Sequence, residues 1–206
     1  MKKTFIYSLL VFAGLASFTS CTTESDVEYP KTKTTLFVEN FSDNDTNHPI
    51  LNTTGWTNFA QVGTKLFTEE IYSGNGYAQF TSFNSGQASN ISWLISPAFD
   101  MSKQDGEKLV FQSAHAFLKS FDNSLELMVS TDYDGNIANF NQSSWLSLPV
   151  NTPKPNSEFY VWVNSGEVDL SKFNGTLHFA FKIKGNGLAN SNVSATYQID
   201  NIRLYY

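Results

Sequence analysis

Two carboxylates stand where a β-strand would turn them toward its apolar face. In the segment Phe37–Phe41, strand alternation places Glu39 on the same face as both phenylalanines. Near the other end of the chain, Asp200 is in phase with Ile202 and Leu204. An ionised carboxylate on such a face is costly unless a partner neutralises it, and calcium is a suitable partner where basic side chains are few.

Two other interpretations of these carboxylates stay open. Either one could accept hydrogen bonds from backbone N–H groups of a neighbouring loop. Alternatively, Tyr197 and Ile199 mark the buried phase of the last strand, and Asp200 then faces water.

A second acidic run, Asp132–Asn136, has the residue types of the opening of a calcium loop. It lacks a third ligand at the proper spacing and the closing glutamate of an EF-hand. A hairpin turn that begins at Asp134-Gly135 explains the run more simply.

Aromatic side chains could stack on the apolar faces of sugar rings. The candidates are Trp56, Trp93, Trp145, Trp162, Tyr72, Tyr77, Tyr133 and Tyr160. We assign Trp56, Trp93 and Trp162 to the core, because large residues fill the space between sheets. Tyr133 and Trp145 flank loops and are expected to be exposed. The sequence assigns no individual ligand-binding residue.

No catalytic site is recognisable. His48, His115 and His178 lie outside any nucleophile elbow or metalloprotease motif. A carboxylate pair for glycoside cleavage could be drawn from Asp132, Asp134, Glu126 and Glu158, but solvated polar faces account for these residues as well. The protein is therefore expected not to be an enzyme.

The elements that must position these side chains are short strands. In Thr176–Lys184, four apolar residues alternate with His178, Ala180, Lys182 and Lys184. Similar alternation recurs along the chain, separated by Gly- and Asn-rich turns, and no window shows a helical stripe. This pattern predicts an all-β sandwich or barrel.

The charge balance argues against nucleic acid as a partner. Without Lys2 and Lys3, the 13 basic residues fall to 11 against 19 acidic ones, a net charge of −8. Arg203 is the only arginine. Cys21 is the only cysteine, which excludes a disulfide within one chain.

The first residues have the organisation of a bacterial lipoprotein signal peptide. Lys2 and Lys3 precede an apolar run that is too short for a permanent transmembrane helix. Cys21 stands where a lipobox places its lipidated cysteine, although Phe18 replaces the usual leucine. We therefore predict a signal peptide at 1–20, a lipidated Cys21 with a flexible tether over 21–35, and a folded domain over 36–206.

Several segments, in this order, resemble exported β-jelly-roll domains of Bacteroidetes known as choice-of-anchor J and cleaved-adhesin-like domains, with a more distant likeness to MAM domains. They are Phe37–Phe41, Gly55-Trp56, Tyr77–Gln79, Trp93–Asp100, Val129–Gly135, Ser165–Ser171 and Tyr197–Ile202. Together they span nearly the whole predicted domain.

The resemblance implies a two-sheet antiparallel β-sandwich of jelly-roll type, lipid-anchored at the outer membrane, exposed at the cell surface and serving in glycan capture or adhesion. It also implies a structural calcium between the first and last strands, with Glu39 and Asp200 as ligands. We therefore expect a non-catalytic carbohydrate-binding lipoprotein. The alternatives are an adhesion or assembly module that binds protein and, with less support, a glycoside-acting enzyme.

Overall fold

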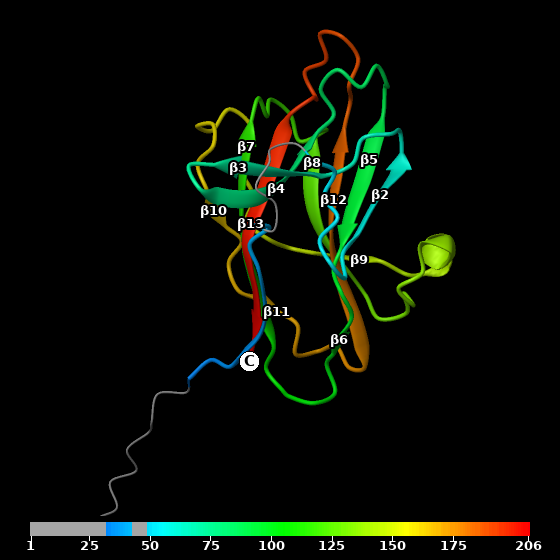
Figure 1. Cartoon of the computed structure of the whole chain (residues 1–206), viewed down its shortest axis with the longest axis vertical. Coiled ribbons are helices and arrows are strands. Elements are labelled where there is room, and N and C mark those ends of the chain that lie inside the picture. Colours follow the sequence, from blue (N-terminus) through cyan, green and yellow to red (C-terminus); the bar gives the residue numbers. More distant parts are fainter. Residues whose placement is uncertain (1–31, 43–48) are drawn as a thin grey trace, which may run out of the picture. The chain divides into compact units, whose positions relative to one another are not determined.

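The computed structural model describes residues 32–42 and 49–206, and its strands are arranged in two antiparallel sheets (Figure 1). The predicted signal peptide, Cys21 and His48 lie outside the described residues. The first strand, β1, begins at Thr35, and Thr34 exchanges two backbone hydrogen bonds with Tyr206.

The first sheet has the strand order β10-β7-β13-β4-β3, with β1 beside β13 and β11 beside β7. Its strands are β1 (Thr35–Glu39), β3 (Thr68–Tyr72), β4 (Asn75–Thr81), β7 (Lys108–Ala116), β10 (Val163–Asn164), β11 (Val168–Asp169) and β13 (Thr196–Tyr205). The first and last strands of the described chain are therefore neighbours, as expected of a jelly roll.

The second sheet has the order β2-β5-β12-β8-β9, and β6 pairs with β12. Its strands are β2 (Thr57–Val62), β5 (Asn90–Ile95), β6 (Phe99–Asp100), β8 (Ser124–Ser130), β9 (Leu146–Leu148) and β12 (Thr176–Gly185). A short 3₁₀ helix, η1 (Ile137–Gln142), lies between β8 and β9. This architecture confirms the predicted two-sheet sandwich.

The core between the sheets is rich in aromatic rings. Phe179 and Phe181 of β12 are fully buried, and both pack against Trp56 with ring centroids 5.8 and 6.5 Å apart. The predicted alternation of β12 is confirmed on this face. His178 and Ala180 on the other face of β12 are also buried, because that face is covered as well.

A second apolar cluster covers the outer face of the second sheet. It contains Trp93, Ile95, Met128, Tyr133, Phe140 and Ala180, with Phe59, Ile91 and Trp145 packed against it. Phe140 comes from η1, which Figure 1 shows to one side of the second sheet, and its ring centroid lies 4.6 Å from that of Phe59 and 4.9 Å from that of Trp93. Among the described residues, no helix packs on the outer face of the first sheet. That face carries the candidate site.

The second cluster overturns two expectations. Tyr133 is buried and Trp145 is half-buried, whereas both were expected to be exposed. Their rings are 5.5 Å apart, and the Tyr133 ring lies 5.0 Å from that of His178. The segment after β8 folds back onto the sheet, so its aromatic residues serve packing.

The turn at Asp134 also differs from the hairpin that was expected. Oδ1 of Asp134 accepts a hydrogen bond from N–H of Asn136, and Asn136 then caps the N-terminus of η1. The turn therefore leads into the 3₁₀ helix, and β9 returns to pair with β8 only after it.

Candidate binding groove

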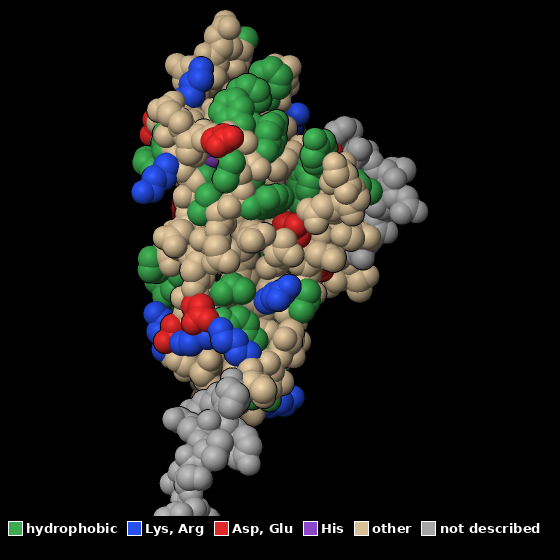
Figure 2. Space-filling model, turned by 90° about the vertical axis from the view of Figure 1, so that its left-hand side faces the viewer, with side chains coloured by type: hydrophobic (Ala, Val, Ile, Leu, Met, Phe, Trp, Pro, Cys, Tyr) green, Lys and Arg blue, Asp and Glu red, His purple; other side chains and the backbone are tan. Residues whose placement is uncertain are grey.

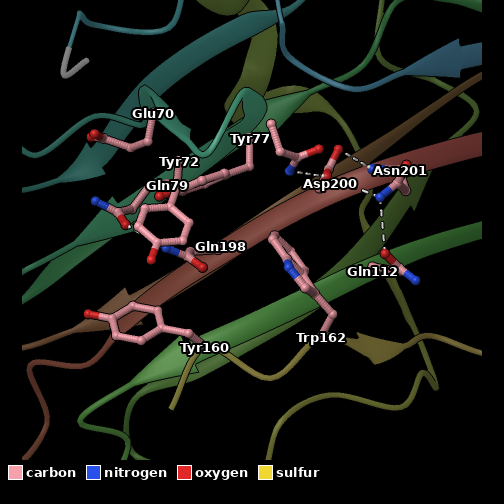
Figure 3. Close-up of a pocket in the computed structure, with 11 residues that line it drawn as sticks. Glu70, Tyr72, Tyr77, Gln79, Gln112, Tyr160, Trp162, Gln198, Asp200 and Asn201 are labelled. Carbon is pink, nitrogen blue, oxygen red and sulfur yellow. Dashed lines mark hydrogen bonds between the residues drawn. The ribbon is translucent and has the colours of Figure 1, made fainter.

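A groove of about 690 Å³ crosses the outer face of the first sheet (Figure 3). It is lined by Glu70 and Tyr72 of β3, Asn75, Tyr77 and Gln79 of β4, Gln112 of β7, Gln198, Asp200 and Asn201 of β13, and Tyr160 and Trp162 ahead of β10. Figure 2 views the molecule from this side and shows mainly uncharged side chains in the middle of the face.

The hairpin of β3 and β4 forms one edge of the groove. Its two-residue turn consists of Ser73 and Gly74, both at positive φ, which is the geometry of tight hairpins. The resulting register places Glu70 opposite Tyr77, so strand alternation turns the two side chains to the same face.

The opposite edge is an irregular segment between β9 and β10 that runs beside β7. N–H of Tyr160 donates a hydrogen bond to the carbonyl of His115 across 2.8 Å, and Asn164 pairs with Gln112. Tyr160 has a φ of 61°, which for a non-glycine residue costs on the order of 1–2 kcal/mol. The fold tolerates this strain where a tyrosine ring is set at the rim of the groove.

Aromatic rings flank the groove on both sides of β13, with Tyr72 and Tyr77 on one side and Tyr160 and Trp162 on the other (Figure 3). The rings of Tyr77 and Trp162 have centroids 6.0 Å apart and an interplanar angle of 72°. Tyr72 is 75% exposed and Tyr160 is 55% exposed. Solvent-facing aromatic surface of this kind can stack on a sugar ring.

The floor between these rings carries amide groups. Nε2 of Gln198 donates a hydrogen bond to Oε1 of Gln79 across 3.0 Å, and the two residues are direct register partners. Nδ2 of Asn201 likewise donates to Oε1 of Gln112. Because amides both donate and accept, they match the hydroxyl groups of a saccharide.

Asp200 is buried at the end of this floor, with 1% exposure. Its Oδ2 accepts hydrogen bonds from Nδ2 of Asn75 at 2.9 Å and from Nδ2 of Asn201 at 3.0 Å, and its Oδ1 accepts one from N–H of Asn201. Burial raises the pKa of Asp200 above its ordinary value, and the hydrogen bonds from Asn75 and Asn201 oppose that shift.

Near the rim, burial raises the pKa of the Tyr77 hydroxyl, and the charge of Glu70 adds to that effect. Oε1 of Glu70 accepts a hydrogen bond from the hydroxyl of Thr68 at 2.8 Å. The groove thus contains acidic groups and, among its lining residues, no basic one.

A bulge in β13 decides which way Asp200 faces. The β13–β7 register shifts between Asp200 and Arg203, and Asn201 has a φ of 53°. Ile199 and Ile202 therefore both face the core although they are three residues apart. The expectation that Asp200 shares a face with Ile202 and Leu204 is wrong, because it assumed unbroken alternation.

Glu39 lies on the inner face, as predicted. Its Oε1 accepts hydrogen bonds from N–H of Asn40 and Phe41 at 3.0 and 2.9 Å, and its Oε2 accepts one from Nε1 of Trp56 at 3.0 Å. This arrangement is the hydrogen-bonded alternative left open by the sequence. Oε2 of Glu39 and Oδ1 of Asp200 each accept one of these bonds, which leaves an acceptor position on each oxygen.

The structure does not bring Glu39 and Asp200 onto one face of the sheet. Within residues 32–42 and 49–206, no group of three or more His, Cys, Asp or Glu side chains is arranged to hold a metal ion. In the described structure, hydrogen bonds satisfy both carboxylates. Calcium binding remains a prediction.

The described histidines are structural. Nε2 of His115 lies 2.7 Å from the hydroxyl of Ser157, and Nδ1 of His178 lies 2.8 Å from the carbonyl of Ser96. Both are buried, and burial lowers the pKa of His115. Neither lines the groove.

The sequence named three of the groove's aromatic residues as stacking candidates, namely Tyr72, Tyr77 and Tyr160. Trp162 was assigned to the core, and the structure corrects this, because the side chain is only half-buried and lines the groove. The glutamines were missed. Their signal was the alternation itself, which places Gln79 in phase with Tyr77 and Gln198 in phase with Asp200.

None of the helical residues in the described ranges belongs to a helix long and apolar enough to cross a membrane. No family model matches the chain, and no curated protein matches it. Comparison with solved structures, in contrast, finds similar folds.

The K1 cleaved adhesin domain of Lys-gingipain from Porphyromonas gingivalis W83 matches with a TM-score of 0.52 and 18% identity, over 82% of this chain and 96% of that domain. The K2 cleaved adhesin domain of Lys-gingipain gives the same TM-score and identity, over 82% and 98%. The xylan-binding CBM22-2 domain of Paenibacillus barcinonensis Xyn10C matches with a TM-score of 0.48 and 10% identity, over 82% and 97%. The chain thus has the β-sandwich fold of the cleaved adhesin domains, which agrees with the predicted resemblance at the level of fold.

Proposed function

We propose that the protein is a non-catalytic, surface-exposed lipoprotein that binds carbohydrate, and that the groove on the first sheet is its glycan-binding site. The observation that carries this proposal is the combination of aromatic rings on both sides of β13 with a floor of amides. Ligand sites in proteins typically combine such apolar surface with a few convergent polar groups.

The extent of the groove favours a glycan chain over a single sugar. It extends across β3, β4, β13 and β7, and aromatic side chains lie along both flanks. Asp200 lies on the floor of the groove and Glu70 lies at its rim. These two carboxyl groups would repel a densely negative polymer. We therefore propose a glycan with a neutral backbone as the ligand.

The anchor is the second part of the proposal. A fatty acid on Cys21 would hold the domain at the outer membrane, and the polar residues that follow would form the spacer. A glycan-binding domain held in this way would capture polysaccharide at the cell surface.

The proposal is tested by affinity electrophoresis and calorimetry on a panel of neutral plant and host polysaccharides. Trp162→Ala is expected to weaken binding at least tenfold, equivalent to about 1.4 kcal/mol. The matched control is Phe121→Ala, since Phe121 is 67% exposed but lies outside the groove. Near-ultraviolet circular dichroism establishes that both variants are folded. Equal binding by both variants, or no binding across the panel, would refute the groove as a glycan site.

A competing function is adhesion to protein, and one observation favours it. Phe117 and Phe159 are both more than two-fifths exposed, and their rings are 4.8 Å apart. If this pair is the functional surface, Phe117→Ser would abolish cell adhesion while Trp162→Ala would not. The opposite result supports the groove.

A further inference from the structure

A second hollow, of about 330 Å³, continues the groove beyond its Asn201 end. It is lined by Val110, Phe111, Gln112, Asn164, Asn201 and Arg203. Gln112 and Asn201 line both hollows and are joined by a hydrogen bond of 3.0 Å. In Figure 3 these two residues lie at the opposite end of the groove from Glu70 and Tyr160.

The bulge in β13 places Arg203 in this second hollow. Asp200 pairs with Gln112 and Arg203 pairs with Val110, so β13 contains one more residue than β7 between these pairs. If β13 kept regular alternation from Asp200 through Asn201 and Ile202, Arg203 would face the core. Bulges re-aim side chains in this way and are frequent beside functional sites.

Arg203 has no ion-pair partner within residues 32–42 and 49–206. The other basic residue in the described strands of the first sheet, Lys108, forms an ion pair of 2.9 Å with Asp169. Lys33, just ahead of β1, pairs with Glu167. Among the described residues, no ion pair or hydrogen bond involves the Arg203 side chain, which is the only guanidinium in the chain.

We propose that Arg203 forms an anion-binding subsite at the end of the groove, which takes the carboxylate of a uronic acid substituent on an otherwise neutral glycan. This inference rests on the proposed glycan-binding function. The planar guanidinium can donate two parallel hydrogen bonds to a carboxylate. The amides of Gln112, Asn164 and Asn201 surround it and are suited to the hydroxyl groups of the same sugar.

The charges along the two hollows restrict the position of such a substituent. Asp200 and Glu70 line the groove, whereas Arg203 lines only its continuation. A uronate is therefore accepted at the Arg203 end and disfavoured along the rest of the groove. The site distinguishes a sparsely substituted glycan from a polyuronate.

The single arginine makes a direct test feasible by NMR, because only one arginine Nε–H signal exists. The protein is titrated with methyl β-D-glucuronide, methyl β-D-glucoside and the 6-sulfate of the glucoside. The glucuronide is expected to shift the Arg203 Nε–H signal saturably, with an affinity at least fivefold higher than that of the glucoside. The effect should weaken with added salt.

Arg203→Lys keeps the charge but removes the planar donor pair, and it is expected to abolish the preference for the glucuronide. Lys108→Gln removes a charge from the same sheet outside both hollows and is expected to retain the preference. Equal affinity for glucuronide and glucoside would overturn the subsite, and so would an unmoved Arg203 signal or an equal response to the sulfate ester.

The two proposals fail in different ways. If neutral polysaccharides bind through Trp162 but the glucuronide leaves Arg203 unaffected, the subsite is wrong and the groove stands. If the glucuronide binds at Arg203 while every polysaccharide fails, the anion subsite stands and the glycan-binding groove does not.

Discussion

Nε1 of Trp56 donates a hydrogen bond to Oε2 of Glu39 across 3.0 Å, so a carboxylate on the inner face of β1 is joined to a core indole. Without the indole N–H of Trp56, Oε2 of Glu39 would lose this hydrogen bond in a partly buried position. A hydrogen bond to a charged group contributes about 1.5–3 kcal/mol. The protein therefore satisfies Glu39 with N–H groups from its own fold.

Trp56→Phe is expected to lower the free energy of unfolding by at least this amount, measured by urea denaturation. Trp145→Phe is a matched control, because Nε1 of Trp145 is buried in the described structure without a hydrogen-bond partner. The control loses ring area but no hydrogen bond. A larger loss for Trp145→Phe than for Trp56→Phe would contradict the role assigned to Glu39.

The calcium prediction can be tested against the same residues. If calcium uses the remaining acceptor position of Glu39, or that of Asp200 on the other face of the sheet, the cation stabilises the folded state by about 2.7 kcal/mol at a concentration 100 times its Kd. We expect the unfolding midpoint of chelator-treated protein to rise with added calcium, and Glu39→Gln to lose that rise. Identical midpoints with chelator and with calcium would remove the cation from this protein.

Asp200 predicts a pH dependence of stability with a defined sign. Burial raises its pKa in the folded state, so the folded protein holds this proton more tightly than the unfolded chain does. The associated stability is present below the unfolded-state pKa and is lost as pH rises through the folded-state pKa.

Asp200→Asn removes this titration. The difference in unfolding free energy between the variant and the wild type is therefore expected to shift in favour of the variant as pH rises through the folded-state pKa. Denaturation at closely spaced pH values measures it. A difference that stays constant, or that changes in the opposite direction, would show that the carboxylate is not destabilised by burial.

The features that could be predicted from the sequence are those that depend on regular alternation along a strand. The apolar face of β12 and the inward position of Glu39 follow from local patterns, and the structure contains them. The two-sheet architecture follows because strands with one apolar face must pack against another such face.

The sequence failed where one inserted residue or a distant segment decides burial. The bulge at Asn201 reverses the phase of β13, and no local signal marks it apart from an asparagine that tolerates positive φ. Tyr133 is buried by packing with Trp145, which comes from beyond η1. Trp162 is a residue type that is usually found in a core. It is partly exposed here because its segment lies at the edge of the sheet, beside β7.

The predicted lipid anchor implies that Cys21 carries a fatty acid, which can be detected directly. Cells that express the full chain are expected to incorporate an alkyne-tagged fatty acid into the protein, and the protein should fractionate with membranes. Cys21→Ser is expected to abolish both, because the chain has no other cysteine. Labelling that survives this substitution, or a wild type that carries no fatty acid, would show the anchor to be wrong.

The paired glutamines on the groove floor predict coupled effects on glycan binding. Gln79 and Gln198 are register partners joined by a hydrogen bond of 3.0 Å, so each orients the amide of the other. Replacing either by leucine removes hydrogen bonds worth about 0.5–1.5 kcal/mol, roughly a two- to tenfold rise in Kd. The double variant is expected to lose less than the sum of the two single effects, because the second substitution removes an amide that has already lost its orientation. Calorimetry on the four proteins measures this coupling, and strictly additive effects would show that the two amides act on the ligand independently.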